Sequence, residues 1–178
     1  MALLALVVAT AWPVAAGGAV EVGPQPHAAP CGPAQLHLAA TFYGAAAGQF
    51  IETLTFTNAG RHDCATSGWP GIAVEDAARR PVSMRVQRVV QGSPTARPYR
   101  SLIVRAGQAA SFDVYGPDFD ARSGRSCPST GSLRVTPPGA RRSLPVDVRL
   151  PLCRLGYYVS PLIAGRSDHL AWTFVWHG

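Results

Sequence analysis

Short runs in which apolar and polar residues alternate recur along the sequence, and they constrain the fold more than any other feature. In one such run Leu36, Leu38, Ala40 and Phe42 occupy every second position. Successive side chains of a β-strand point to opposite faces, so this spacing predicts antiparallel sheets with one buried and one wet face. Comparable runs lie at residues 50–56, 72–74, 82–86, 102–104, 110–114, 133–135, 146–150 and 170–176.

Turn-forming residues separate these runs, and after the first residues no stretch of helical length follows a period of 3.6 residues. The chain has 18 Gly and 16 Pro. Eight or nine short strands at this spacing predict an all-β protein, an immunoglobulin-like antiparallel β-sandwich. The name describes architecture alone, because the Cys–Trp–Cys spacing of antibody domains is not clearly met. At one turn, we expect Asn58 to support left-handed backbone geometry at Ala59-Gly60.

Four cysteines, Cys31, Cys64, Cys127 and Cys153, predict two disulfides. They form no Cys-x-x-Cys pair, which disfavours a zinc knuckle or a redox motif. Three pairings are open; we expect Cys31–Cys64 and Cys127–Cys153, because sequential pairing closes the shortest loops. Each loop of about 30 residues would contribute about 3.5 to 4 kcal/mol in the chain-entropy model. The alternative is a cytosolic protein with buried free thiols.

The N-terminal residues resemble a secretory signal. A short apolar run at residues 3–11 is followed by small residues, which predicts a signal peptide over residues 1–16 with cleavage after Ala16 or Ala19. No basic residue precedes the run, so we expect the true start to lie upstream; the alternative is a buried N-terminal strand or helix. We expect residues 17–30 to form a flexible leader, because they are rich in Pro, Ala and Gly.

The position of Cys31 disfavours a lipid anchor, because Cys31 follows Pro30 and lies far from the apolar run. We expect a secreted mature chain without a transmembrane segment.

The charged residues limit the kinds of reaction that the chain could catalyse, but they do not identify a function. All 16 basic residues are Arg, against 10 acidic residues, for a formal charge of +6. The absence of Lys excludes a Schiff-base lysine, a Walker A loop and a Ser-x-x-Lys hydrolase. Arginine can bind phosphate or carboxylate groups, so an anionic envelope polymer is a candidate partner. The alternative is a scattered, solvated surface. No aromatic-interleaved motif indicates nucleic-acid binding.

Several segments together resemble DUF4232, a family of exported actinobacterial proteins of unknown function. The resemblance covers residues 31–165 and includes the four cysteines. Its motifs are Thr53-Leu54-Thr55-Phe56-Thr57-Asn58, Gly68-Trp69-Pro70-Gly71-Ile72, the segment 102–112, and Tyr158-Val159-Ser160-Pro161-Leu162. The resemblance implies an envelope protein with a β-rich domain, and it brings no activity and no catalytic residue.

No arrangement of residues predicts a catalytic centre, a metal site or a cofactor. The five histidines, among them His62 beside Asp63, lack the spacing of a zinc site. A hydrolase would need two carboxylates across a cleft, for which Glu75 and Asp113 are candidates. Glu52 interrupts an apolar row, so we expect that end of its strand to be open to water.

The last residues, 166–178, carry an aromatic row. Leu170, Trp172, Phe174 and Trp176 share one face of an expected C-terminal strand. We expect this strand to complete the core. The alternative is an exposed interaction site, formed by Trp172, Phe174 and Trp176, for a partner's sheet or a stacking ligand.

These observations predict an exported, non-enzymatic β-sandwich that serves as a binding or interaction module of the cell envelope. Its expected partner is an envelope protein or an anionic polymer. Two alternatives remain: a secreted hydrolase with a carboxylate-lined cleft, and a structural wall protein that adheres to anionic polymers through its arginines.

Overall fold

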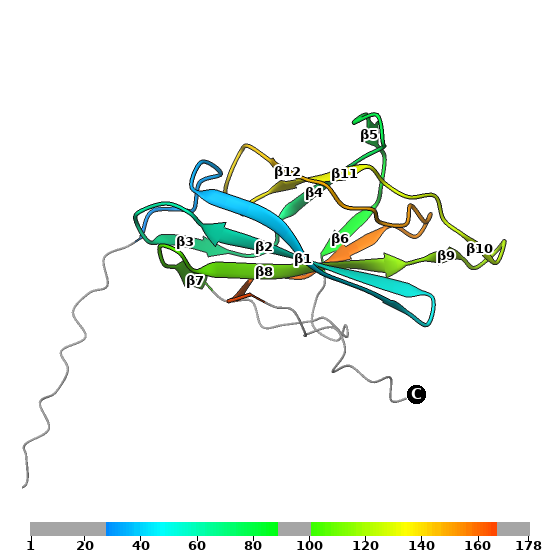
Figure 1. Cartoon of the computed structure of the whole chain (residues 1–178), viewed down its shortest axis with the longest axis horizontal. Helices are drawn as coiled ribbons and strands as arrows, with labels where there is room; N and C mark the ends of the chain where they lie inside the picture. The colour runs from blue at the N-terminus through cyan, green and yellow to red at the C-terminus, as the bar shows by residue number, and fades with distance from the viewer. Residues whose placement is uncertain (1–27, 89–100, 167–178) are drawn as a thin grey trace, which may run out of the picture.

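A computed structural model describes residues 28–88 and 101–166, and every regular element in these ranges is a strand (Figure 1). The expected signal peptide, most of the leader, and the tail with Trp172, Phe174 and Trp176 lie outside the described residues. The prediction of an all-β protein with two disulfides is confirmed. No helix among the described residues has the length and apolar character needed to cross a membrane.

The two longest strands, β1 and β2, pair as a hairpin in the larger sheet. Its order is β1-β2-β8-β13-β6, and β14 also pairs with β8. All its pairs are antiparallel except β13 with β6, which is parallel and departs from the antiparallel expectation. The strands are β1 (Leu36–Ala46), β2 (Gln49–Asn58), β6 (Val86–Arg88), β8 (Ala109–Pro117), β13 (Tyr157–Val159) and β14 (Ile163–Ala164).

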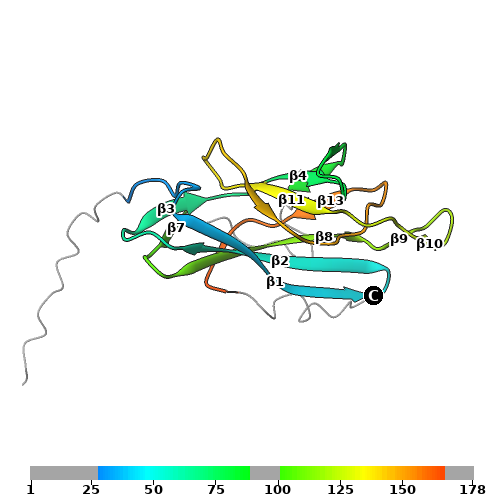
Figure 2. The same cartoon turned by 45° about the horizontal axis from the view of Figure 1, so that its top comes forward.

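A four-stranded antiparallel sheet of order β12-β11-β4-β5 forms the second layer. Figures 1 and 2 show it lying over one face of the larger sheet. Its strands are β4 (Gly71–Glu75), β5 (Pro81–Val82), β11 (Ser132–Thr136) and β12 (Leu144–Val146). Val148 and Leu150 continue the buried alternation after β12 without being strand residues.

Two small ribbons complete the fold. One pairs β3 (Cys64–Ser67) with β7 (Ser101–Val104), and the other pairs β9 (Phe119–Asp120) with β10 (Arg125–Ser126). The β9–β10 hairpin projects from one end of the molecule (Figure 1). The two-residue strands β9, β10 and β14 are too short for period-two alternation to reveal them. The run predicted at residues 82–86 forms two short strands, β5 and β6, because residues 83–85 belong to neither.

The hydrophobic core lies between the two sheets. Leu54, Phe112 and Val114 of the larger sheet and Leu133 and Val135 of the second sheet are each no more than 1% exposed, and all five belong to one buried cluster. Because each such side chain loses nearly all contact with water, burial contributes about 1.5 to 3 kcal/mol per residue.

The opposite, polar face of β2 and β8 is also buried. The sequence predicted that one face of each sheet would be in contact with water, and these two strands depart from that prediction. Thr53, Thr55, Ser111 and Asp113 are each 3% exposed or less. Their polar atoms bond to one another: Thr53 Oγ1 donates to Asp113 Oδ1 at 2.8 Å, and the Thr55 and Ser111 hydroxyls lie 2.9 Å apart. These bonds satisfy buried polar groups, so the two central strands tolerate burial on both faces.

Both disulfides have the sequential pairing expected from the sequence, with Cα–Cα distances of 4.8 Å for Cys31–Cys64 and 5.3 Å for Cys127–Cys153. The first fastens the entry of the folded domain to β3, where Cys31 N also donates to Ala65 O at 2.8 Å. The second joins the end of the β9–β10 hairpin to the turn before β13.

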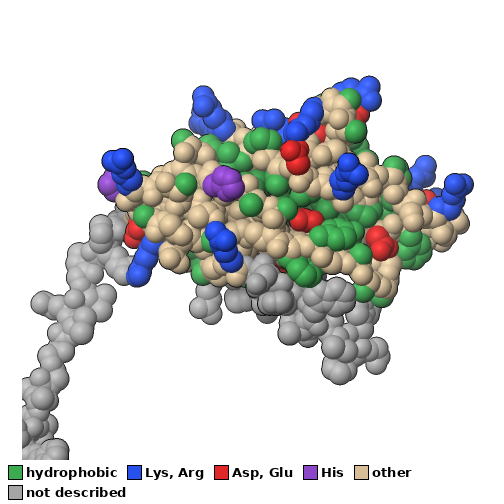
Figure 3. Space-filling view, viewed as in Figure 1, with side chains coloured by type: hydrophobic (Ala, Val, Ile, Leu, Met, Phe, Trp, Pro, Cys, Tyr) green, Lys and Arg blue, Asp and Glu red, His purple; other side chains and the backbone are tan. Residues whose placement is uncertain are grey.

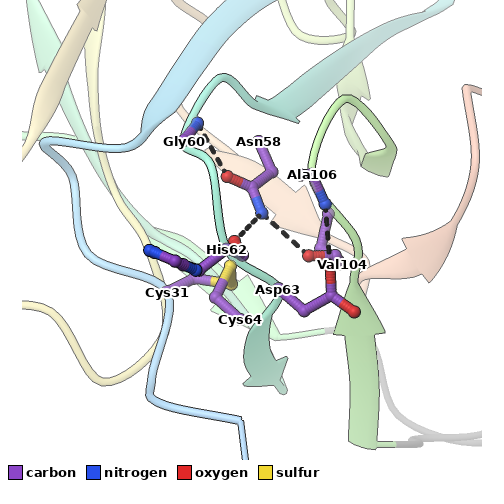
Figure 4. Close-up of a disulfide and its surroundings, with 8 residues drawn as sticks. All are labelled: Cys31, Asn58, Gly60, His62, Asp63, Cys64, Val104 and Ala106. Carbon is purple, nitrogen blue, oxygen red and sulfur yellow. Dashed lines mark hydrogen bonds between the residues drawn. A yellow bond between two sulfur atoms is a disulfide. The ribbon is translucent and has the colours of Figure 1, made fainter.

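Asn58 fixes the chain beside the first disulfide by hydrogen bonding rather than by left-handed geometry (Figure 4). None of Asn58, Ala59 and Gly60 has a positive φ, so that expectation was wrong. The fully buried Asn58 amide donates to His62 O and Val104 O, each at 2.9 Å, and its Oδ1 accepts from Gly60 N at 3.0 Å. One side chain thereby joins the end of β2, the following turn and β7.

Candidate functional site

Most of the described arginines have no acidic partner within the described part of the chain. Ion pairs join Arg80 to Asp76 at 2.8 Å and Arg79 to Asp147 at 2.7 Å, and Arg134 lies 4.0 Å from Glu75. Figure 3 shows arginines spread around the visible face of the domain instead of gathered in one patch. A specific contact with an anion therefore depends on a place where local structure brings arginines together.

Arg85 and Arg154 line the same hollow, which has a volume of about 500 Å³. The hollow lies between the connection from β5 to β6 and the turn that precedes β13. It is lined by Val82, Ser83, Met84, Arg85, Leu152, Cys153 and Arg154. No carboxylate is among the described residues that line the hollow, so none of them neutralises the charge of the two arginines.

Backbone contacts hold the two arginine-bearing segments against each other. Strand β6 runs parallel to β13, with Val86 paired to Tyr157, and Tyr157 N donates to Arg85 O at 2.8 Å. Gly156 has a φ of +82°, and a Cβ at this position would collide with Arg85 O. Glycine therefore allows an approach that any other residue would prevent.

The turn that carries Arg154 is closed and cross-linked. Gly156 N donates to Cys153 O at 3.0 Å, and the Cys127–Cys153 disulfide fastens the start of the turn. Arg154 itself is exposed, as is Arg85. The two side chains thus extend into water from a backbone that the disulfide and the β6–β13 pair keep in place.

The wall of the hollow combines an apolar floor with polar donors. Val82, Met84 and Leu152 are partly buried and pack against the core, whereas Ser83 is exposed. Two guanidinium forks and a hydroxyl can donate hydrogen bonds to a group with several oxygen acceptors. The site is therefore suited to an oxyanion whose uncharged part lies on the apolar floor.

Glu52 is a second unusual group, and it lies near the start of β2. Its side chain is only 5% exposed, so the expected opening to water at this residue was wrong. Burial raises the pKa of the Glu52 carboxyl to about 7. Tyr43, its cross-strand neighbour on β1, is 50% exposed and stacks on Phe50 with 6.4 Å between ring centroids. The exposed tyrosine ring at this end of the sheet thus accompanies a carboxyl that is withdrawn from water.

Glu75 and Asp113, the carboxylates considered for a hydrolase, do not face each other. Glu75 alternates with the core residue Val74 on β4, and Asp113 alternates with the core residue Phe112 on β8. Each carboxylate therefore lies on the outer face of its own sheet, on opposite sides of the core. Glu75 accepts a hydrogen bond from Ser132 Oγ at 2.8 Å.

The histidines form no metal centre in the described ranges. His37 and His62 are exposed, and no group of three or more His, Cys, Asp or Glu side chains is placed to hold a metal ion there. His27, His169 and His177 lie outside the described residues.

Arg85 and Arg154 were not singled out by the sequence. They are far apart along the chain, and they line one hollow because the pairing of β6 with β13 brings their segments together. The one signal near them is the position of Arg154 directly after Cys153, which the predicted disulfide would fasten.

The fold and its cross-links define a disulfide-bonded, two-layered all-β domain. A family model described as "Domain of unknown function (DUF4232)" matches residues 31–160, and the chain belongs to this family. No curated protein and no solved structure is significantly similar to the chain. The match confirms the resemblance carried by the cysteines and the strand motifs.

Proposed function

We propose that the chain is an exported, non-enzymatic binding module of the cell envelope, and that its partner is an anionic polymer. Its two disulfides support an extracellular location, because such bonds persist in oxidising compartments. The hydrophobic segment and the small residues over 1–16 support export by a signal peptide.

The observation that carries the proposal is the surplus of arginines without acidic partners. Arg85, Arg154, Arg141 and Arg142 are exposed and form no ion pair with any other described residue. Guanidinium groups stay charged at every physiological pH, and unpaired surface cations attract polyanions over about 10 Å. An envelope rich in anionic polymer would therefore retain the protein electrostatically.

The placement of Glu75 and Asp113 favours binding over hydrolysis. A pair of carboxylates on opposite sides of the core cannot act on one bond. The cationic surface, and not this pair of carboxylates, therefore carries the proposed function.

Sedimentation with isolated cell envelopes tests the proposal. The oxidised, full-length protein is expected to sediment with envelopes at low salt and to be released as salt increases, because salt screens exposed charges. Sedimentation that salt does not reduce would indicate a different kind of partner, such as an envelope protein bound through apolar contacts. That result, like a complete lack of sedimentation, would reject the electrostatic proposal.

A further inference from the structure

We propose that the hollow lined by Arg85 and Arg154 binds a phosphate group of an anionic polymer. This inference rests on the proposed function and gives it a discrete site. Its basis is one concavity whose lining includes two exposed arginines and an exposed serine, and no carboxylate among the described residues.

The number of donors favours phosphate over carboxylate. One guanidinium fork occupies both oxygens of a planar carboxylate. A phosphate group is tetrahedral and offers oxygens in several directions, so forks from Arg85 and Arg154 can approach it from two sides. The Ser83 hydroxyl can donate to a further oxygen.

The floor of the hollow favours a phosphate that is attached to a larger molecule. Val82, Met84 and Leu152, which are partly buried and pack against the core, line the same hollow as the two arginines. A bare ion would leave this surface in contact with water. The carbon skeleton between the phosphates of a polymer would cover it and add a modest apolar contribution.

The scaffold favours a preorganised site. The Cys127–Cys153 bond, the Tyr157 N to Arg85 O bond of 2.8 Å and the close approach at Gly156 fix both backbone segments before any ligand arrives. Less conformational freedom is then lost on binding, which increases affinity.

The affinity of the oxidised full-length protein for inorganic polyphosphate tests the site. The variant R85Q/R154Q removes both guanidinium groups, and R141Q/R142Q removes two exposed arginines between β11 and β12 that do not line the hollow. Both variants lower the net charge equally. We expect the first to weaken binding at least about tenfold, and the second less than about threefold, because only the first removes charge-assisted hydrogen bonds.

Each outcome separates the site from the broader function. Equal losses in the two double variants would overturn the site and leave the electrostatic function standing, whereas a wild-type protein that binds neither polyphosphate nor polygalacturonate would overturn both. Polygalacturonate tests a polymer that carries carboxylates in place of phosphates. If it bound more tightly than polyphosphate, with the same sensitivity to R85Q/R154Q, the choice of phosphate would be overturned.

The thermal unfolding midpoint verifies that each variant is folded, and the single variant Arg154→Gln on the exposed turn repeats the test. An unchanged affinity in that variant would contradict the site.

Discussion

At the residue scale, Asn58 combines three structural roles in one buried amide. It ends β2, it accepts from the turn at Gly60 and it donates to the carbonyls of His62 and Val104 (Figure 4). The sequence placed this residue correctly at a turn. Its partners could not be predicted, because Val104 belongs to a strand far along the chain.

Replacing Asn58 tests this arrangement. Asn58→Ala leaves two carbonyls and one N–H without their partner, and we expect it to lower the free energy of unfolding by about 2 to 4 kcal/mol. Asn58→Asp keeps the shape but directs an oxygen, in place of the amide donor, at two carbonyl oxygens. We expect it to destabilise the protein at neutral pH at least as much as alanine does. Urea denaturation measures both, and an Asp variant as stable as the wild type would contradict the hydrogen-bond assignment.

At the element scale, β2 is the strand with the most unusual surroundings. Its polar residues Thr53 and Thr55 are buried by pairing with β8, whereas Glu52 is buried on the core side of the strand. Alternation revealed which residues share a face of β2. It could not reveal that both faces lose contact with water, because burial of the threonines depends on partners from another strand.

The Glu52 carboxyl makes stability depend on pH. Its pKa is near 4.5 in an unfolded chain and about 7 in the folded protein, so the folded state prefers the protonated form. Stability is therefore greatest below about pH 4.5 as far as Glu52 is concerned, and it falls as the pH rises through about 7. At pH 8 we expect Glu52→Gln to be more stable than the wild type by on the order of 2 kcal/mol, with little difference at pH 4.

Denaturant unfolding at several pH values measures this difference. Asp147→Asn serves as the control, because the Asp147 side chain is 77% exposed and its removal would produce no comparable trend near neutral pH. A stability difference for Glu52→Gln that does not change between pH 4 and pH 8 would reject the account of this strand.

At the scale of the whole molecule, two cross-links hold a domain whose sheets come from distant parts of the chain. The disulfide pairing and the all-β class could be predicted, because short loops and period-two alternation are local properties of the sequence. The parallel β13–β6 pair could not, since β6 has only three residues and its partner lies far along the chain. The hollow with Arg85 and Arg154 depends on that strand pair, so it could not be predicted from the sequence either.

Removal of either disulfide tests the contribution of the cross-links. The loops span 33 residues for Cys31–Cys64 and 26 for Cys127–Cys153. We expect C31A/C64A and C127A/C153A each to lose about 3.5 to 4 kcal/mol of unfolding free energy, because the unfolded chain gains freedom. Urea denaturation of the oxidised variants measures the loss, with the reduced wild type as a reference. A loss below about 1 kcal/mol would contradict the role assigned to that bond.

The central claim is that unpaired arginines bind this domain to an anionic polymer of the envelope. The most direct measurement is the fraction of oxidised, full-length protein that sediments with isolated envelopes as salt rises from about 0.05 M to about 0.5 M. The account predicts nearly complete sedimentation at the low end and release at the high end. A bound fraction that stays constant across this range, or no binding at its low end, would contradict it.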